Sequence, residues 1–180
     1  MFTVTNLRTM DHLHRNRKKS GCMSGVILLC VLFFIDPHAT FAQVVVYKGN
    51  SSYTSDILCK VKGGRIYKKN SNYTSDVACH IGGDRVYKGT SGYTSDVIYT
   101  VKEGKVYRGT SAYTSDIVIT IRDGKIYRGT SNYSSDILAN IRDGKVYDKT
   151  SGYTSDILFT IKGEVTIAEL AGIWWMVHNP

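Results

Sequence analysis

Proline is almost absent from this chain. The 180 residues contain two prolines, Pro37 and the last residue, Pro180. Because proline cannot donate a backbone hydrogen bond, the long stretch between them is free to form uninterrupted hydrogen-bonded strands. Cysteine and histidine are also scarce after residue 42, where Cys59, Cys79, His80 and His178 are the only ones. A metal site built from clustered thiol and imidazole groups needs more ligands than this.

Residues that stand apart as catalytic groups are lacking too. An active site normally needs one nucleophile, one base and one orienting group, whereas nearly every polar residue of interest here recurs six times. No Ser/His/Asp or Cys/His set is set apart from its copies, and no glycine-rich phosphate loop precedes a helix. We therefore predict that the protein is not an enzyme and uses no cofactor.

Concentrated charge of one sign is missing. Lys and Arg number 23 against 15 Asp and Glu, and the excess is spread thinly along the chain without a block of like charges. A nucleic-acid partner would require the basic residues to cluster on one face. This distribution predicts a solvated surface and no nucleic-acid partner.

Only one long hydrophobic run occurs, "GVILLCVLFFI" at residues 25–35. It follows the basic segment "RNRKKS" and precedes "TFA", whose small residues fit a cleavage site after Ala42. This layout predicts a signal peptide over residues 1–42 and a protein that is secreted or held in the periplasm or cell envelope. A signal-anchor is the alternative, although the run is shorter than the roughly 20 residues that span a bilayer. We expect no stable membrane span after cleavage.

What the chain has in abundance is a repeat of 20 residues. Six copies follow one another without insertions, starting at Val46, Ile66, Val86, Val106, Ile126 and Val146. The second and eighth positions are always Tyr, the sixth is always Ser, and the tenth and eleventh are always Ser-Asp. A fixed period of this length is typical of repeat architectures in which each unit covers its neighbour.

Each copy is predicted to form two strands. In the fourth copy, "KVYR" is a short strand and "YTSDIVITI" alternates from Tyr113 to Ile121, which are strand patterns. This alternation directs positions 57, 59 and 61, with their equivalents, to the core and position 60 to solvent. Asp-Gly between copies is a strong signal for a two-residue hairpin. Residues 43–164 are therefore predicted to be an all-β domain of six tandem hairpins.

The arrangement of the hairpins has two solutions. A single hairpin is not stable in water, so the copies must cover one another. The first and last copies keep every constant position, which favours a closed ring, propeller-like or flower-like, over a linear hairpin solenoid.

Residues 165–180 differ from the repeat. Thr166 and Glu169 have capping-box spacing, and an apolar helix follows that we expect to plug or cover one end of the array. A partner-binding helix is the alternative.

The two tyrosine columns are the candidate binding residues. Aromatic rows can hold cations and stack sugars, and they also stabilise cross-strand pairs. We assign ligand binding to the second-position column, which consists of Tyr47, Tyr67, Tyr87, Tyr107, Tyr127 and Tyr147.

The eleventh-position carboxylates are assigned a structural role. A lone carboxylate beside serine commonly accepts hydrogen bonds from turn amides. Calcium is the alternative, but it requires several oxygen ligands, and each repeat has one acid in this column. The residues are Asp56, Asp76, Asp96, Asp116, Asp136 and Asp156, and we predict no metal site.

Cys59 and Cys79 occupy the same position in adjacent copies. If the copies place them on neighbouring strands, the two residues can form a disulfide in an oxidising compartment. Two buried thiols are the alternative, since this position faces the predicted core.

Over residues 45–163, the "VYRGTS" and "YTSDI" units with their "DG" links resemble the short β-hairpin repeats of exported bacterial proteins of the β-flower or hairpin-array type. Choline-binding wall modules are similar in period, but both tryptophans here lie in the terminal helix. The predicted signal peptide and the lack of a distinct catalytic set indicate a secreted, non-catalytic module. We expect it to bind a ligand several times over at the cell envelope or outside the cell, with envelope polysaccharide as the candidate. The alternative is a scaffold protein without a ligand site.

Overall fold

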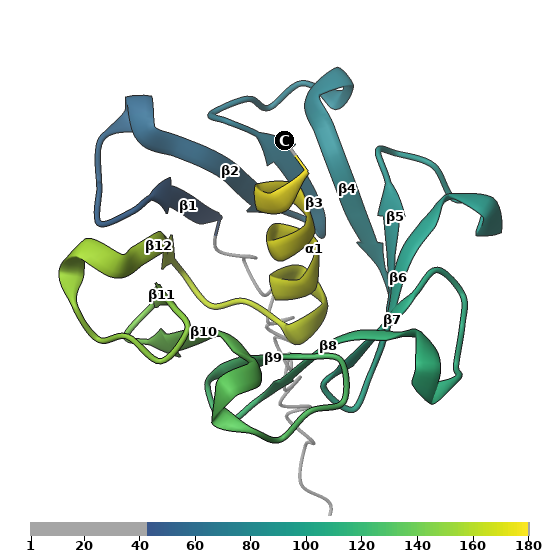
Figure 1. Ribbon diagram of the computed structural model, residues 1–180. Helices are drawn as coiled ribbons and strands as arrows, with labels where there is room; N and C mark the ends of the chain where they lie inside the picture. The colour runs from purple at the N-terminus through teal and green to yellow at the C-terminus, as the bar shows by residue number, and fades with distance from the viewer. Residues whose placement is uncertain (1–42, 180) are drawn as a thin grey trace, which may run out of the picture. The chain divides into compact units, whose positions relative to one another are not determined.

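The computed structural model describes residues 43–179 (Figure 1). The predicted signal peptide, residues 1–42, lies outside the described residues, so export stays a prediction.

Twelve strands form the described part of the chain, as the repeat predicts. In chain order they are β1 (Val44–Lys48), β2 (Ile57–Lys62), β3 (Arg65–Lys68), β4 (Val77–Gly82), β5 (Arg85–Lys88), β6 (Val97–Lys102), β7 (Lys105–Arg108), β8 (Ile117–Arg122), β9 (Lys125–Arg128), β10 (Ile137–Arg142), β11 (Lys145–Asp148) and β12 (Ile157–Lys162). A short 3₁₀ turn precedes each long strand: η1 (Thr54–Asp56), η2 (Thr74–Asp76), η3 (Thr94–Asp96), η4 (Thr114–Asp116), η5 (Ser134–Asp136) and η6 (Thr154–Asp156).

The strands form a closed antiparallel barrel. Every strand pairs with its neighbour in sequence, and β1 pairs with β12 as well as with β2. In the closing pair, Val46 lies opposite Ile161, so β1 stands beside β12 as β3 stands beside β2. The last strand, β12, thus pairs with β1 from the start of the domain, and this pair completes the sixth hairpin. The predicted closed ring is confirmed, and a linear solenoid is not needed.

The Asp-Gly links form the predicted hairpins. At the turn between β8 and β9, Asp123 has a φ of 49° and Gly124 a φ of 67°. Positive φ at both central residues is the geometry of a type I′ turn, whose twist matches that of the strands it joins. These turns gather at one end of the barrel, and the loops that contain the 3₁₀ turns gather at the other.

We predicted a single uninterrupted alternation along each long strand, and this prediction was wrong at the start of the strand. The 3₁₀ turn delays the strand until Ile57, and a bulge then shifts the register: Val46 lies opposite Cys59, but Tyr47 lies opposite Ile57. Because cross-strand partners share a face, Ile57 lies on the outer wall with Tyr47. It is buried there, as predicted, but outside the interior cluster. Leu58, the extra residue of the bulge, packs against the interior cluster.

Position 60 and its equivalents do not face solvent as predicted. Lys60, Thr120 and Thr160 are buried, because the loop that follows the next strand folds over them. Thr120 donates its hydroxyl to the carbonyl of Gly129 at 2.7 Å. Thr160 makes the same bond to Gly49, across the closure of the ring.

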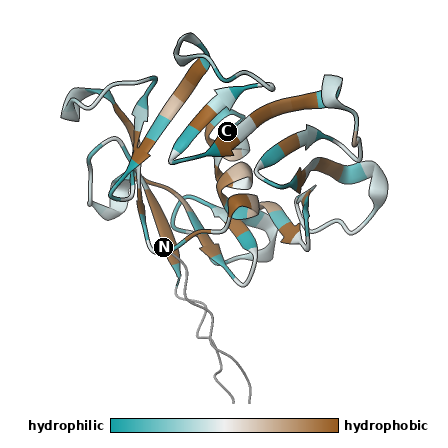
Figure 2. Cartoon of the chain, turned by 90° about the horizontal axis from the view of Figure 1, so that it is seen from below, coloured by the Kyte–Doolittle hydropathy of each residue, from teal (hydrophilic) through white to brown (hydrophobic). Residues whose placement is uncertain are grey.

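Helix α1 (Ile167–His178) runs along the inside of the barrel (Figure 1). It begins with the predicted capping box, in which Thr166 Oγ1 accepts from the Glu169 amide and the Glu169 carboxylate accepts from the Thr166 amide. The helix packs against β2 to β6. In Figure 2, hydrophobic residues follow the strands and this central helix, while the outer loops are pale or hydrophilic.

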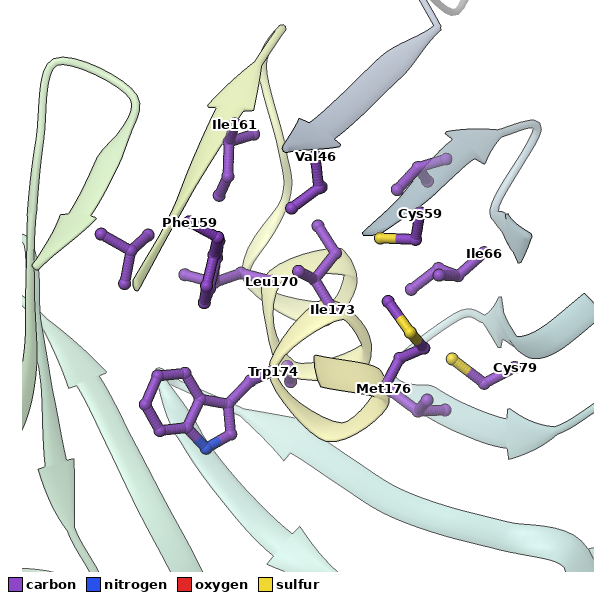
Figure 3. Close-up of a cluster of buried hydrophobic side chains, with 14 of the residues drawn as sticks. Val46, Cys59, Ile66, Cys79, Phe159, Ile161, Leu170, Ile173, Trp174 and Met176 are labelled. Carbon is purple, nitrogen blue, oxygen red and sulfur yellow. The ribbon is translucent and has the colours of Figure 1, made fainter. Parts of the chain in front are cut away.

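The interior is filled differently on its two sides (Figure 3). On one side the helix approaches the strands closely: a Cβ added to Gly172 would lie 2.7 Å from Cδ1 of Ile66. On the other side Trp174 reaches towards Phe159, with ring centroids 6.5 Å apart. The fourteenth position of the repeat, which lies in this interior, varies from copy to copy and is Cys59, Cys79, Tyr99, Ile119, Ala139 and Phe159.

Candidate functional site in the petal loops

Six loops of the same sequence pattern stand at one end of the barrel, and we call them the petal loops: residues 49–56, 69–76, 89–96, 109–116, 129–136 and 149–156. The C-terminal end of α1 lies at this same end, since Met176 and Val177 border a cavity together with the first two petal loops. Whatever one petal loop presents to solvent is therefore presented six times around the ring.

A serine organises each petal loop. Ser111 donates its hydroxyl to the carboxylate of Asp116 at 2.5 Å and accepts the amide N–H of Tyr113 at 3.1 Å. The Asp116 amide in turn donates to the carbonyl of Tyr113 at 3.0 Å, closing the 3₁₀ turn. The same three bonds recur in the other five loops. The loop thus has a defined conformation that does not depend on the tyrosine side chain.

The aspartates make a structural contact, but with a different partner from the one predicted. We expected turn amides to donate to the carboxylates, whereas the donor is the serine hydroxyl of the same loop. In the last loop this bond from Ser151, together with one from Ser155, lowers the pKa of Asp156 below its ordinary value of 3.8. The serine at the sixth position donates its hydroxyl to the aspartate at the eleventh in all six loops. The aspartates are Asp56, Asp76, Asp96, Asp116, Asp136 and Asp156.

The second-position tyrosines, to which the sequence assigned ligand binding, lie on the outer wall of the barrel. Tyr67, Tyr127 and Tyr147 are buried, and Tyr47, Tyr87 and Tyr107 are half-buried. Several of these rings already have a partner: the Arg122 guanidinium lies 4.5 Å from the centre of Tyr127, Lys162 lies 4.9 Å from that of Tyr47, and His80 stacks on Tyr87. Protein groups cover much of the ring surface in this column.

The eighth-position tyrosines are the exposed ones. They stand at the petal loops with 74 to 78% of their surface accessible, and they are Tyr53, Tyr73, Tyr93, Tyr113, Tyr133 and Tyr153. The sequence marked this column as aromatic but placed it at the start of a strand. The preceding "GTS" turn and the serine two residues before each tyrosine are the signals that place it in a loop.

Basic residues accompany the exposed tyrosines. The third position of the repeat ends the short strand at the base of each petal loop. It is exposed and basic in five copies, namely Lys48, Lys68, Lys88, Arg108 and Arg128, and it is Asp148 in the sixth. This end of the barrel therefore presents exposed aromatic rings and exposed cationic side chains, which can bind sugars and anionic groups.

The predicted disulfide between Cys59 and Cys79 is not formed, because both thiols are free and buried in the barrel interior. The prediction treated adjacent copies as adjacent strands, whereas β3 lies between β2 and β4. Two strand spacings amount to about 10 Å, beyond the roughly 7 Å over which Cα atoms can be bridged. Burial raises the pKa of Cys79 to about 12 and raises that of Cys59 further, so neither thiol is activated.

Among residues 43–179, no group of three or more His, Cys, Asp or Glu side chains is placed to hold a metal ion. In the same part of the chain no helix has the length and hydrophobicity needed to cross a bilayer.

A closed ring of six hairpins, whose outward loops share the same constant residues and hydrogen bonds, defines the class of protein. Residues 46–171 match the family model described as 6-fold beta flower protein, so the chain belongs to this family. No curated protein and no solved structure matches the chain.

Proposed function

We propose that this protein is an exported, non-catalytic binding module that holds a repetitive ligand, such as cell-envelope polysaccharide, through the exposed tyrosines of its petal loops. The observation that carries this proposal is a contrast between two adjacent loop positions. The seventh position is exposed and varies among Ser, Asn, Gly and Ala, whereas the eighth is also exposed and is always Tyr. Packing does not require the tyrosine ring, so a ligand is the simplest reason to keep it.

The ring geometry supports a polymeric ligand. Six equivalent loops offer six equivalent weak sites, and linking weak sites raises overall avidity by a factor of about 10²–10⁴ without new contacts. A free small molecule would gain nothing from this repetition. The hydrogen bonds of Ser111 in its loop fix the base of the tyrosine before binding, which reduces the entropy lost when a ligand orders the loop.

Titration calorimetry against fragmented envelope polysaccharide tests the proposal. We expect several equivalent sites and a stepwise loss of affinity as Tyr113→Ala, Tyr133→Ala and Tyr153→Ala are combined. Asn132→Ala is the matched control, because it alters the exposed side chain beside Tyr133 and keeps the ring. Tyr107→Phe tests the outer-wall column in the same assay.

Two results would contradict this function. A single strong site abolished by one substitution would indicate a different kind of binding protein. Absence of binding to envelope polysaccharide from several sources would favour the alternative, in which the repeats serve only as a structural scaffold. Export is tested separately by sequencing the N-terminus of the mature protein, for which we expect a start at Gln43.

A further inference from the structure

A cavity of about 740 Å³ opens at the petal-loop end of the barrel. It lies between the first two petal loops and the last turn of α1, so it combines one part of the repeat with a segment that occurs once in the chain. Its volume is within the roughly 300–1,000 Å³ of small-molecule sites.

The mouth of this cavity is cationic. Lys48, Lys68 and Lys69 line it, and all three side chains are exposed. Asp56 is the one acidic residue in the lining, and its carboxylate is already hydrogen-bonded to Ser51 at 2.5 Å. The ammonium groups therefore outnumber the carboxylate and are available to an anion.

The floor of the cavity is apolar. Leu58, the extra residue of the β2 bulge, lies beside Met176 and Val177 from the helix. Met176 belongs to the buried interior cluster, and the other two pack against it. A ligand that covered this floor would remove apolar surface from water, which favours binding in proportion to the area covered.

This corner of the ring departs from the repeat. Gly-Thr occupies the fourth and fifth positions of the third, fourth and fifth copies. The first copy has Gly49 and Asn50, the second has Lys69 and Asn70, and the sixth has Lys149 and Thr150, so asparagine at the fifth position is confined to the two copies that line the cavity. Lys69 keeps the left-handed backbone of the glycines, with a φ of 53°, a conformation that residues other than glycine seldom adopt. A lysine here adds a charge at a position where glycine would suit the backbone better.

We infer that this cavity is a binding site for an anionic amphiphile, a molecule that joins an acidic head group to an apolar chain or ring. The head group pairs with the lysines at the mouth, and the apolar part lies on Leu58, Met176 and Val177. The site makes no use of the exposed tyrosine rings and does not depend on the function proposed above.

Fluorescence titration with 8-anilinonaphthalene-1-sulfonate tests this inference on the full-length protein. N-phenyl-1-naphthylamine serves as the paired probe, because it has the same aromatic rings without the sulfonate. We expect one site per chain for the anionic dye and clearly weaker binding of the neutral dye. Equal affinity for the two dyes, or several equivalent sites for the anionic one, would overturn the inference.

Paired variants place the site. Lys68→Ala with Lys69→Gly should lower the affinity for the anionic dye by a factor of about five to twenty, since each exposed charge pair contributes a modest amount to the binding free energy. Lys88→Ala with Lys149→Gly is the matched control: it makes the same changes at the same repeat positions, outside the cavity lining. Lys149 also has a left-handed backbone, so both glycine substitutions suit the chain. Equal losses in the two double variants would show adsorption to surface charge only.

Two further variants test the floor and separate the two proposals. Val177→Asn should weaken both dyes, and thermal unfolding checks that the variant is folded. Unchanged affinity for both dyes in a folded variant would show that the helix is not part of the binding site. Tyr133→Ala should leave dye binding unchanged while it weakens polysaccharide binding, so that failure of one proposal is distinguishable from failure of the other.

Discussion

The barrel interior and the petal loops treat the six copies of the repeat in opposite ways. At the fourteenth position, inside the barrel, the residue changes from Cys79 in one copy to Phe159 in another. In the petal loops the Ser, Tyr and Ser-Asp positions do not change at all. One helix cannot present the same surface to six strands, so the residues at the fourteenth position meet different parts of the interior. The constant residues of each petal loop instead make the same hydrogen bonds within their own loop. The copies are alike where their surroundings are alike.

The exposed loop surface adds a second contrast. At neighbouring positions of one loop, Asn132 becomes Gly or Ala in other copies, whereas Tyr133 does not vary. Both side chains face solvent. Equal surroundings therefore permit uniformity without demanding it. The tyrosine column requires a further reason, and we propose that this reason is ligand binding.

The largest effect should come from emptying the interior. Phe159→Ala should lower the free energy of unfolding by about 3–5 kcal/mol, because the ring is fully buried and packs beside Trp174. Tyr153→Ala removes a similar volume from a petal loop and should change stability by less than about 0.5 kcal/mol. Chemical denaturation measures both values, and similar losses would refute the contrast between the two regions.

Overfilling the close side of the interior should have the next largest effect. Gly172→Val should destabilise the protein by about 1–3 kcal/mol, because its side chain would meet Ile66 and then Cys79. Adding Ile66→Val removes the terminal methyl group of Ile66 and should recover part of the loss. A double-mutant cycle that shows no coupling between these positions would contradict the packing described.

Within the petal loops, the serine should matter more for stability than the exposed side chains. Ser111→Ala removes both the donor to Asp116 and the acceptor for the Tyr113 amide, and it should cost about 1 kcal/mol. Thr110→Ala, an exposed neighbour in the same loop, is the control and should have little effect. Equal stability of the two variants would mean that the hydrogen bonds do not hold the loop.

The smallest effect concerns the charge state of one carboxyl group. Ser151→Ala should raise the pKa of Asp156 towards 3.8, because the Ser151 hydroxyl is the main cause of its lowered value, and Ser155→Ala should raise it less. Because the pKa of Asp156 is lower in the folded state, its carboxylate stabilises the fold at pH values above the pKa of the unfolded state. This contribution is lost as the pH falls through the pKa of the folded state. Carboxyl-carbon NMR titration measures the shift. An unchanged pKa in Ser151→Ala would show that another group sets it.

Much of the fold follows from local patterns that a single copy contains. "RDGK" forms its hairpin because Asp123 and Gly124 tolerate positive φ with no help from the rest of the chain. Thr166 and Glu169 start the helix by hydrogen bonds within one turn. The repeat as a whole has the periodicity from which twelve strands can be predicted.

The candidate site was less accessible to such reasoning. The sequence shows two tyrosine columns. We predicted that the ligand binds to Tyr47 and its equivalents, and not to Tyr53 and its equivalents. A continuous alternation from Tyr53 to Val61, as the sequence predicts, would direct the Tyr53 column to the core. The 3₁₀ turn of η1 interrupts it, because Ser51 bonds to both Asp56 and the Tyr53 amide, and the strand begins only at Ile57.

By itself, the sequence determined the period, the hairpins, the constant loops and the apolar helix, since each depends on interactions between residues close together in the chain. Tertiary structure alone decided that β1 closes the ring against β12, that Leu58 rather than Ile57 reaches the interior, and that β3 separates Cys59 from Cys79. It also decided which tyrosines meet solvent. These outcomes depend on which strand lies beside which and on what covers each face, and both are set by contacts between residues far apart in the sequence.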